Sequence, residues 1–182
     1  MLNWLLHEEP LTPDEELTLA VLDHLLMGTT AASLYKPLAE SGLGEAVVGG
    51  GLSDELKQAT FSVGLKGVAP ADVAKAESLV LDSLSQIAKE GFPPDAVEAS
   101  LNSIEFALRE FNTGSYPKGL SLMLTLMPRW IHKKGAPLDA LRFEKPLGRL
   151  KERLAQGEQV FEAMLRKMLL ANTHRNTVEL QP

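Results

Sequence analysis

Apolar residues recur along the chain with two different spacings, and the two spacings predict two kinds of secondary structure. A spacing of three or four residues, typical of one face of an amphipathic helix, recurs in several stretches. These stretches are 14–27, 73–90, 97–111, 147–154 and 160–169. Strict alternation in Phe61–Val68 predicts a half-buried strand, and shorter strands are expected at Asn3–Leu6 and Asn176–Gln181. We therefore expect an α+β fold, a small antiparallel or mixed sheet with a layer of helices on one face and a helix-rich C-terminal part.

Capping and breaking residues set the expected helix boundaries. Thr12-Pro13-Asp14-Glu15 is a capping box with proline at the first helical position, and Gly28 is expected to end that helix. A second helix is expected from about residue 31 to 40, with Pro37 bending it or lying in its first turn. Leu120–Ile131 is apolar nearly all round, which predicts a buried helix that Pro128 kinks or stops.

A run of three glycines follows two valines at the start of the expected hairpin. Gly49, Gly50 and Gly51 offer no side chains to pack, so another backbone or a ligand could approach closely. A flexible turn is the competing interpretation. The polar stretch 52–60 then connects this strand to the one that begins at Phe61, through a long or bulged connection.

Length and composition exclude several classes of protein. The 182 residues suffice for one domain, with a subdivision near residue 92 as the alternative, because the chain beyond it is almost entirely helical. The absence of cysteine excludes a disulfide scaffold, a thiolate zinc site and a cysteine nucleophile. No apolar run is long enough to span a bilayer, and a net charge of −6 argues against nucleic acid as a partner.

Charge is distributed unevenly along the chain. Residues 1–60 hold ten acidic and two basic residues, whereas residues 118–175 hold five acidic and twelve basic ones. Such an asymmetry is typical of a partner surface or of one wall of a cavity. Solvent-exposed helix faces that differ in charge without any functional reason explain it as well.

Motif chemistry nominates no catalytic residue. The histidines His7, His24, His132 and His174 are never four residues apart, so no helix face carries a pair of imidazoles for zinc. His24, on an apolar helix, is expected to be a satisfied core or boundary residue. The sequence contains no nucleophile elbow, and the glycine run lacks the lysine and hydroxyl residue of a phosphate loop.

Several segments, in this order and spacing, resemble the presequence protease branch of the pitrilysin (insulinase-like) zinc metallopeptidases. The resemblance covers nearly the whole chain. The segments are Leu22–Thr29, Ser33–Leu38, Ser41–Ala46, Val48–Leu56, Phe61–Val68, Glu98–Phe106, Asn112–Met123 and His174–Pro182.

The resemblance implies the second, non-catalytic unit of the N-terminal half of such an enzyme. In that family an inverted HxxEH motif and a distal glutamate hold the zinc, and this sequence contains neither. We therefore expect no catalytic residue, metal or cofactor in this chain. Residues 1–182 are expected to be a fragment of a longer parent enzyme that holds the zinc elsewhere. We expect no targeting peptide in this fragment. The implied partners are the remaining units of the parent and unfolded peptide substrates, without nucleic acid or membrane. The implied compartment is the mitochondrial matrix or chloroplast stroma, or the cytoplasm of a bacterium.

The resemblance also points to a binding site. In insulinase-like relatives the corresponding unit offers a sheet edge to the N-terminal part of the substrate. The matching residues here are Gly49, Gly50, Gly51, Phe61 and Val63, with the glycines permitting close approach and Phe61 supplying an apolar contact. A hairpin that only stabilises its own domain is one alternative for this segment. For the whole chain, the alternative is a free-standing peptide-binding or subunit-assembly protein of the same fold with no peptidase activity.

Overall fold

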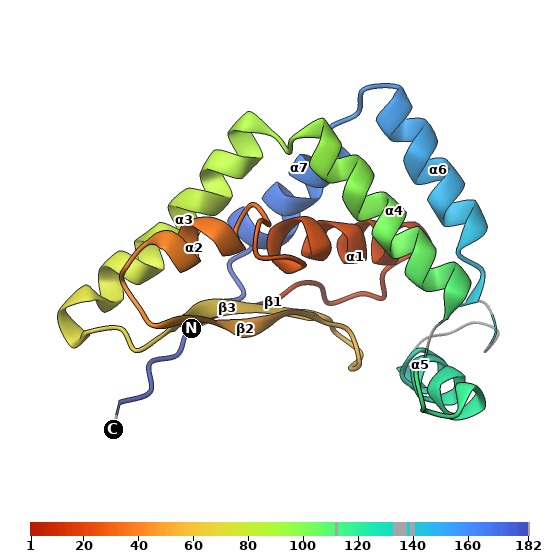
Figure 1. The fold of residues 1–182 in the computed structure, drawn as a ribbon, viewed down its shortest axis with the longest axis horizontal. Coiled ribbons are helices and arrows are strands. Elements are labelled where there is room, and N and C mark those ends of the chain that lie inside the picture. Colours follow the sequence, from red (N-terminus) through yellow and green to blue (C-terminus); the bar gives the residue numbers. More distant parts are fainter. Residues whose placement is uncertain (112, 133–137, 139–140, 182) are drawn as a thin grey trace.

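The computed structural model describes residues 1–111, 113–132, 138 and 141–181, and it forms two layers, as Figure 1 shows. Helices cover one face of a four-stranded sheet, and the other face carries no helix in the described part of the chain. The strands are β1 (Leu2–Leu5), β2 (Ala46–Ser53), β3 (Thr60–Lys66) and β4 (Arg175–Thr177). The predicted α+β class is confirmed.

The sheet has the order β2-β3-β1-β4, and every neighbouring pair is antiparallel. The predicted hairpin is the pair β2 and β3. The N-terminal strand lies in the middle of the sheet, because β1 pairs with β3 on one side and with β4 on the other. The two ends of the chain therefore lie in one sheet, and β2 and β4 are its edge strands.

The first helix, α1 (Pro13–Met27), is built as its sequence predicts. The hydroxyl of Thr12 accepts the N–H of Glu15, and the Glu15 carboxylate accepts the N–H of Thr12, so the capping box is complete. Gly28 is the C-cap. In the second half of α1, Leu22 and Leu26 are almost completely buried, which fixes the helix against its neighbours.

The remaining helices follow the predicted boundaries closely. They are α2 (Tyr35–Glu40), the short 3₁₀ turn η1 (Pro70–Asp72), α3 (Val73–Glu90), α4 (Pro94–Glu110), α5 (Lys118–His132), α6 (Glu144–Ala155), α7 (Val160–Leu165) and the π-helical turn η3 (Arg166–Leu170). In α2 the helix begins later than predicted, and Pro37 lies in its first turn, where a proline is tolerated.

One hydrophobic core lies between the helices and the sheet. It contains Trp4 and Phe61 from the sheet and Phe161 and Met168 from the C-terminal helices, among others. The Trp4 indole N–H donates to the carbonyl of Leu169 at 2.9 Å, so the buried ring keeps its hydrogen bond. The core includes residues from both sides of position 92, and the subdivision there stays a prediction.

The prediction that α5 is buried is wrong. Leu122 and Leu126 are half-buried, but Trp130 and Ile131 are 61% and 65% exposed, and four more apolar residues of the helix are exposed. These four are Leu120, Met123, Leu124 and Met127. In Figure 1 this helix lies outside the layer formed by the other helices. Pro128 lies inside α5 and does not end it.

The C-terminal strand also differs from its prediction. The alternation in 176–181 predicted a strand with Val178 and Leu180 on one face, but β4 ends at Thr177. Val178 is half exposed and Leu180 is 96% exposed. Val178 still exchanges two backbone hydrogen bonds with Met1, each 2.8 Å long, so the pairing continues one residue past the strand and then stops.

Candidate peptide-binding edge

The side of β2 that faces away from β3 is a free sheet edge, and we call it the β2 edge. β2 pairs with β3 alone among the described strands. An unpaired edge presents main-chain N–H and C=O groups that a further extended chain can bind. Three of the five predicted binding residues, Gly49–Gly51, belong to this strand.

The register shows which backbone groups of β2 point outward. The N–H of Leu5 donates to the carbonyl of His174, away from β3. The directions of the backbone N–H and C=O groups alternate from residue to residue along an antiparallel strand. The residue of β1 before Leu5 therefore points toward β3, and its partner Phe61 points back toward β1. Leu52, which pairs with Phe61 on β2, consequently points to the open edge. By the same alternation, Val47, the partner of Leu65, points outward as well.

The glycine run forms a bulge inside the strand. The pairing shifts by one residue between Val48 and Gly51, and Gly49 and Gly51 have φ angles of +102° and +64°. A Cβ atom on Gly49 would lie 2.5 Å from the carbonyl oxygen of Ser62 and 2.7 Å from the Cα of Val63. Gly49 therefore allows close approach of the neighbouring β3 backbone, and the glycine run is part of a strand rather than of a flexible turn.

Phe61 and Val63, the other two predicted residues, lie on the inner face of β3. They are 2% and 0% exposed, and the Phe61 ring packs edge-on against Trp4 with ring centroids 6.0 Å apart. Both side chains support the sheet beneath the helices. The structure thus brings the five residues into one hairpin, with the glycines on the edge strand, where Gly49 and Gly50 are exposed and Gly51 is buried.

Sequence reasoning missed one residue at this edge, Asp23 of α1. Its carboxylate Oδ1 accepts the N–H of Leu52 at 2.8 Å, which connects the helix layer to the β2 edge. Burial raises the pKa of Asp23 above its ordinary value and Asp54 adds to this, while the Leu52 N–H and the nearby His24 oppose it. An acidic residue inside the apolar run Leu22–Leu26 was the available signal.

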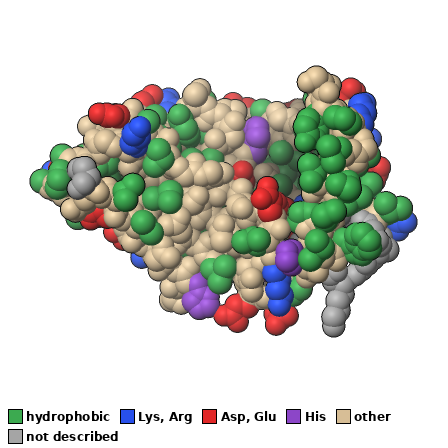
Figure 2. Space-filling model, turned by 90° about the horizontal axis from the view of Figure 1, so that it is seen from below, with side chains coloured by type: hydrophobic (Ala, Val, Ile, Leu, Met, Phe, Trp, Pro, Cys, Tyr) green, Lys and Arg blue, Asp and Glu red, His purple; other side chains and the backbone are tan. Residues whose placement is uncertain are grey.

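The open face of the sheet carries small and polar side chains. Asn3 of β1 and Thr60 and Ser62 of β3 alternate with the core residues of their strands, and Asn3 donates to Asn176 of β4 at 3.1 Å. In Figure 2, which views the molecule from below, much of the surface is formed by backbone and uncharged polar atoms. Apolar side chains gather into a dense group on the right of that view.

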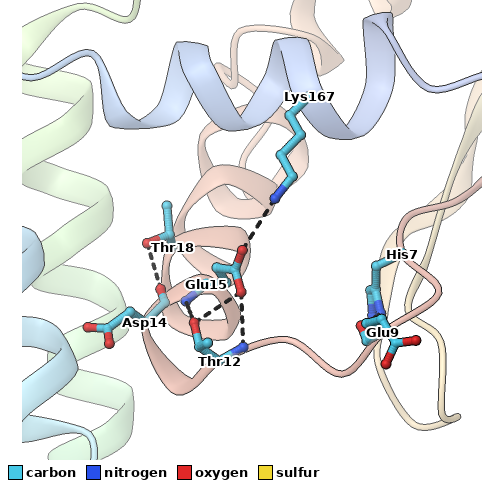
Figure 3. A network of polar contacts seen from close by, with 7 residues as sticks. All are labelled: His7, Glu9, Thr12, Asp14, Glu15, Thr18 and Lys167. Carbon is cyan, nitrogen blue, oxygen red and sulfur yellow. Dashed lines mark hydrogen bonds and ion pairs between the residues drawn. The ribbon is translucent and has the colours of Figure 1, made fainter.

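Part of the charge asymmetry consists of ion pairs within the chain. The three consecutive acids at the start of α1 contact three different helical segments: Asp14 pairs with Arg149, Glu15 with Lys167 and Glu16 with Arg129. Figure 3 shows Lys167 reaching down to Glu15, which also completes the capping box with Thr12. The Thr12 backbone N–H contributes most to lowering the pKa of Glu15, and the Thr12 hydroxyl and Lys167 add to it. Glu8, Glu9 and Glu55 stay exposed.

His7 and His24 have structural partners. His24 Nδ1 lies 3.0 Å from the Ser100 hydroxyl, as expected for a satisfied boundary residue. His7 accepts the N–H of Ala59 at Nε2, and its Nδ1 lies 2.7 Å from the Glu9 carbonyl oxygen, where only a donating N–H fits. Within the residues that the structure describes, no group of three or more acidic or histidine side chains could hold a metal ion. None of the described helices is long and apolar enough to cross a bilayer.

An apolar groove of about 790 Å³ lies between the hairpin of β2 and β3, helix α3 and the C-terminal segment. It is lined by Val48 of β2, Leu65 of β3, Val73 and Val80 of α3 and the C-terminal segment 177–181, among others. Sequence reasoning did not predict it, because its walls come from four distant parts of the chain.

Comparison with known proteins agrees with this architecture. The sequence model of the family described as "Peptidase M16 inactive domain" matches residues 1–104, more than half of the chain. A putative zinc protease from Bordetella pertussis has a similar solved structure, with a TM-score of 0.65 over 97% of this chain and 92% of that one, at 19% identity. The inactive peptidase domain of a putative zinc protease from Bordetella parapertussis gives a TM-score of 0.64 over 100% of this chain and 90% of that one, at 18% identity.

Sequence relatives extend the match to the whole chain. Presequence protease 1, chloroplastic/mitochondrial, of Arabidopsis thaliana is 52% identical over 182 residues, which are 99% of this chain and 17% of the relative. The mitochondrial presequence protease of Mus musculus is 30% identical over 169 residues, 92% of this chain and 16% of the relative. The chain thus spans about one sixth of the length of these relatives.

Proposed function

Because the chain belongs to the M16 peptidase family and matches its inactive domain, we propose that it forms a non-catalytic wall of a peptidase chamber. The β2 edge of this wall holds unfolded peptide. The observation that carries this proposal is the free edge of β2, with the backbone of Val47 directed outward. A peptide that adds as a further strand is held by main-chain hydrogen bonds, which do not depend on its sequence. Such a site suits an enzyme that must accept many peptides.

The composition of the sheet supports the role of a wall. Asn3, Thr60 and Ser62 give the middle of the open face a polar surface, and the exposed side chain of Leu5 lies beside them. A surface of mainly polar groups with isolated apolar side chains has no large apolar area to which one particular apolar peptide would bind tightly. It therefore favours transient contact with varied peptides over selection of one sequence.

The chemistry of the proposed enzyme lies outside this chain. In metal-assisted peptide hydrolysis, zinc polarises a water molecule and a glutamate acts as general base. We propose that another unit of a longer parent protein supplies the metal ligands and this base, and that the described residues contribute binding alone. The remaining units of the parent are then the partners of this chain.

The names of the relatives suggest the substrate and compartment. Relatives called presequence proteases are described as mitochondrial or as chloroplastic/mitochondrial. We extend this to propose cleaved targeting peptides and other short unfolded peptides as substrates, in the mitochondrial matrix or chloroplast stroma, or in the cytoplasm of a bacterium.

Val47→Pro in the full-length protein tests the binding edge. Proline removes the outward N–H without breaking the pairing with β3, because edge strands tolerate proline where the N–H faces solvent. The matched control is Val47→Ala, which keeps the N–H and loses a similar amount of packing. We expect the dissociation constant of a fluorescent unfolded peptide, measured after chelation has stopped cleavage, to rise about five-fold in Val47→Pro relative to Val47→Ala. Equal dissociation constants for the two variants would contradict the proposal.

A further inference from the structure

The β2 edge does not offer all of its outward amides to a peptide. Of the outward positions Val47 and Leu52, the second already donates its N–H to Asp23 Oδ1 at 2.8 Å. We propose that Asp23 ends the binding edge, so that a bound strand pairs with the first part of β2 and cannot extend past Gly51. This inference rests on the proposed function, because it assigns the length and register of the peptide that the same edge accepts.

The fold holds the carboxylate of Asp23 at this position. Its neighbours Leu22 and Leu25 are buried in the core, so α1 cannot rotate to withdraw the side chain without exposing them. On the strand side, Gly51 has a φ of +64°, and a Cβ atom there would collide with Asp23 Oδ1. The glycine leaves the space that the carboxylate occupies.

An approaching peptide would have to compete with Asp23 for one donor. Pairing at Leu52 requires a peptide carbonyl oxygen at the position of Asp23 Oδ1, and a single N–H makes one well-aligned bond. The carboxylate is half-buried, with His24 beside it and Asp54 nearby, so releasing it without a new partner is unfavourable. A peptide carbonyl gains less binding free energy at Leu52 than at Val47, because no described side chain already accepts the N–H of Val47. Strand addition therefore ends before Leu52.

The test is hydrogen exchange of the full-length protein with and without a saturating, uncleaved extended peptide, comparing wild type, Asp23→Ala and Asp23→Asn. In wild type, we expect the peptide to slow exchange at Val47 and to leave Leu52, already protected by Asp23, unchanged. In Asp23→Ala, the free Leu52 amide should exchange fast without peptide and become protected with it. Asp23→Asn keeps an acceptor oxygen in the same shape and should behave as wild type.

A series of peptides of increasing length gives a second readout. In wild type, affinity should stop rising once the peptide fills the edge up to Gly51. In Asp23→Ala, it should rise about five-fold more for peptides two residues longer, because one further main-chain hydrogen bond becomes available. If Asp23→Ala fails to fold, Asp23→Ser, with its shorter side chain, replaces it in both measurements.

The outcomes separate this inference from the proposed function. Protection at Val47 in every variant, with no peptide-dependent protection at Leu52 in Asp23→Ala, would overturn the role of Asp23 and leave the binding edge in place. A peptide that displaces Asp23 and protects Leu52 more strongly in wild type would overturn it too. Binding of peptide with no change at either amide would overturn the proposed edge itself and the role of Asp23 with it.

Discussion

The two edges of the sheet are built in opposite ways. β4 is three residues long, and after it Val178 exchanges two backbone hydrogen bonds with Met1 before the chain leaves the sheet. β2 is eight residues long and has a glycine bulge at its centre. Proteins commonly keep edge strands short, bulged or covered, because a long free edge recruits other chains. β4 follows the first of these solutions, whereas β2 keeps a long edge and limits it with a bulge and with Asp23, as expected of an edge whose pairing is useful but must be controlled.

The largest expected effect is on the bulge of β2. Gly49→Val places a branched side chain at a φ of +102° and against the β3 backbone, which we expect to lower the free energy of unfolding by about 3 kcal/mol. Gly50→Val is the matched control, because a Cβ atom at Gly50 meets nothing within 4 Å. Urea denaturation of the two variants measures the difference. Equal stability would show that the bulge is not a fixed part of the strand.

One side chain, Asn172, fixes the chain just before the β4 edge. The Asn172 amide donates to the carbonyls of Leu5 and Met168, and its oxygen accepts the N–H of His174. Asn172→Ala removes all three bonds and should cost about 2 kcal/mol of stability in the same denaturation experiment. Peptide affinity should not change, because this edge lies across the sheet from β2. Loss of peptide binding in a folded Asn172→Ala variant would mean that the two edges are not independent.

Asp23 makes the stability of the β2 side depend on pH. Because its pKa is raised in the folded state, mainly by burial, the native protein binds this proton more readily than the unfolded chain does. Stability should therefore fall as pH rises from the ordinary aspartate pKa of about 3.9 through the folded pKa. Asp23→Asn removes this contribution, so the stability of wild type relative to the variant should decline over that range in urea denaturation at successive pH values. A difference that stays constant with pH would contradict the assignment.

The smallest expected effect is on the outer face near β4. Asn176→Ala removes the exposed hydrogen bond with Asn3 and should cost about 0.5 kcal/mol in thermal denaturation. A cost above about 2 kcal/mol would show that the polar face stabilises the sheet rather than only covering it.

The sequence predicts the helices and strands of this fold better than it predicts which of their surfaces are covered by other parts of the chain. The capping box at Thr12 and the breaker Gly28 act within a few residues of themselves, so both ends of α1 follow from local chemistry. The burial of α5 and the length of β4 depend instead on which surfaces lie beside them. The apolar pattern of α5 shows that a partner would stabilise it, but not that the described chain supplies one.

The candidate site divides in the same way. The glycine run indicated an unusual strand, because glycine is the residue that tolerates positive φ and close backbone contact. The alternation that made Phe61 a strand residue could not show which face it occupies until the helices were placed. Asp23 was missed because its partner, Leu52, lies 29 residues away, and no local pattern reports that contact.

The most direct test of the central claim uses a peptide whose own backbone is altered. Two forms of one uncleaved extended peptide would carry N-methyl groups on alternate residues, one form on the odd residues and the other on the even residues. If the peptide adds as a strand to β2, only one set of its amides faces the edge, so methylating that set should weaken binding to the full-length protein by ten-fold or more, and methylating the other set should leave it nearly unchanged. Equal affinity of both forms and the unmodified peptide would show that main-chain pairing at this edge does not hold the substrate.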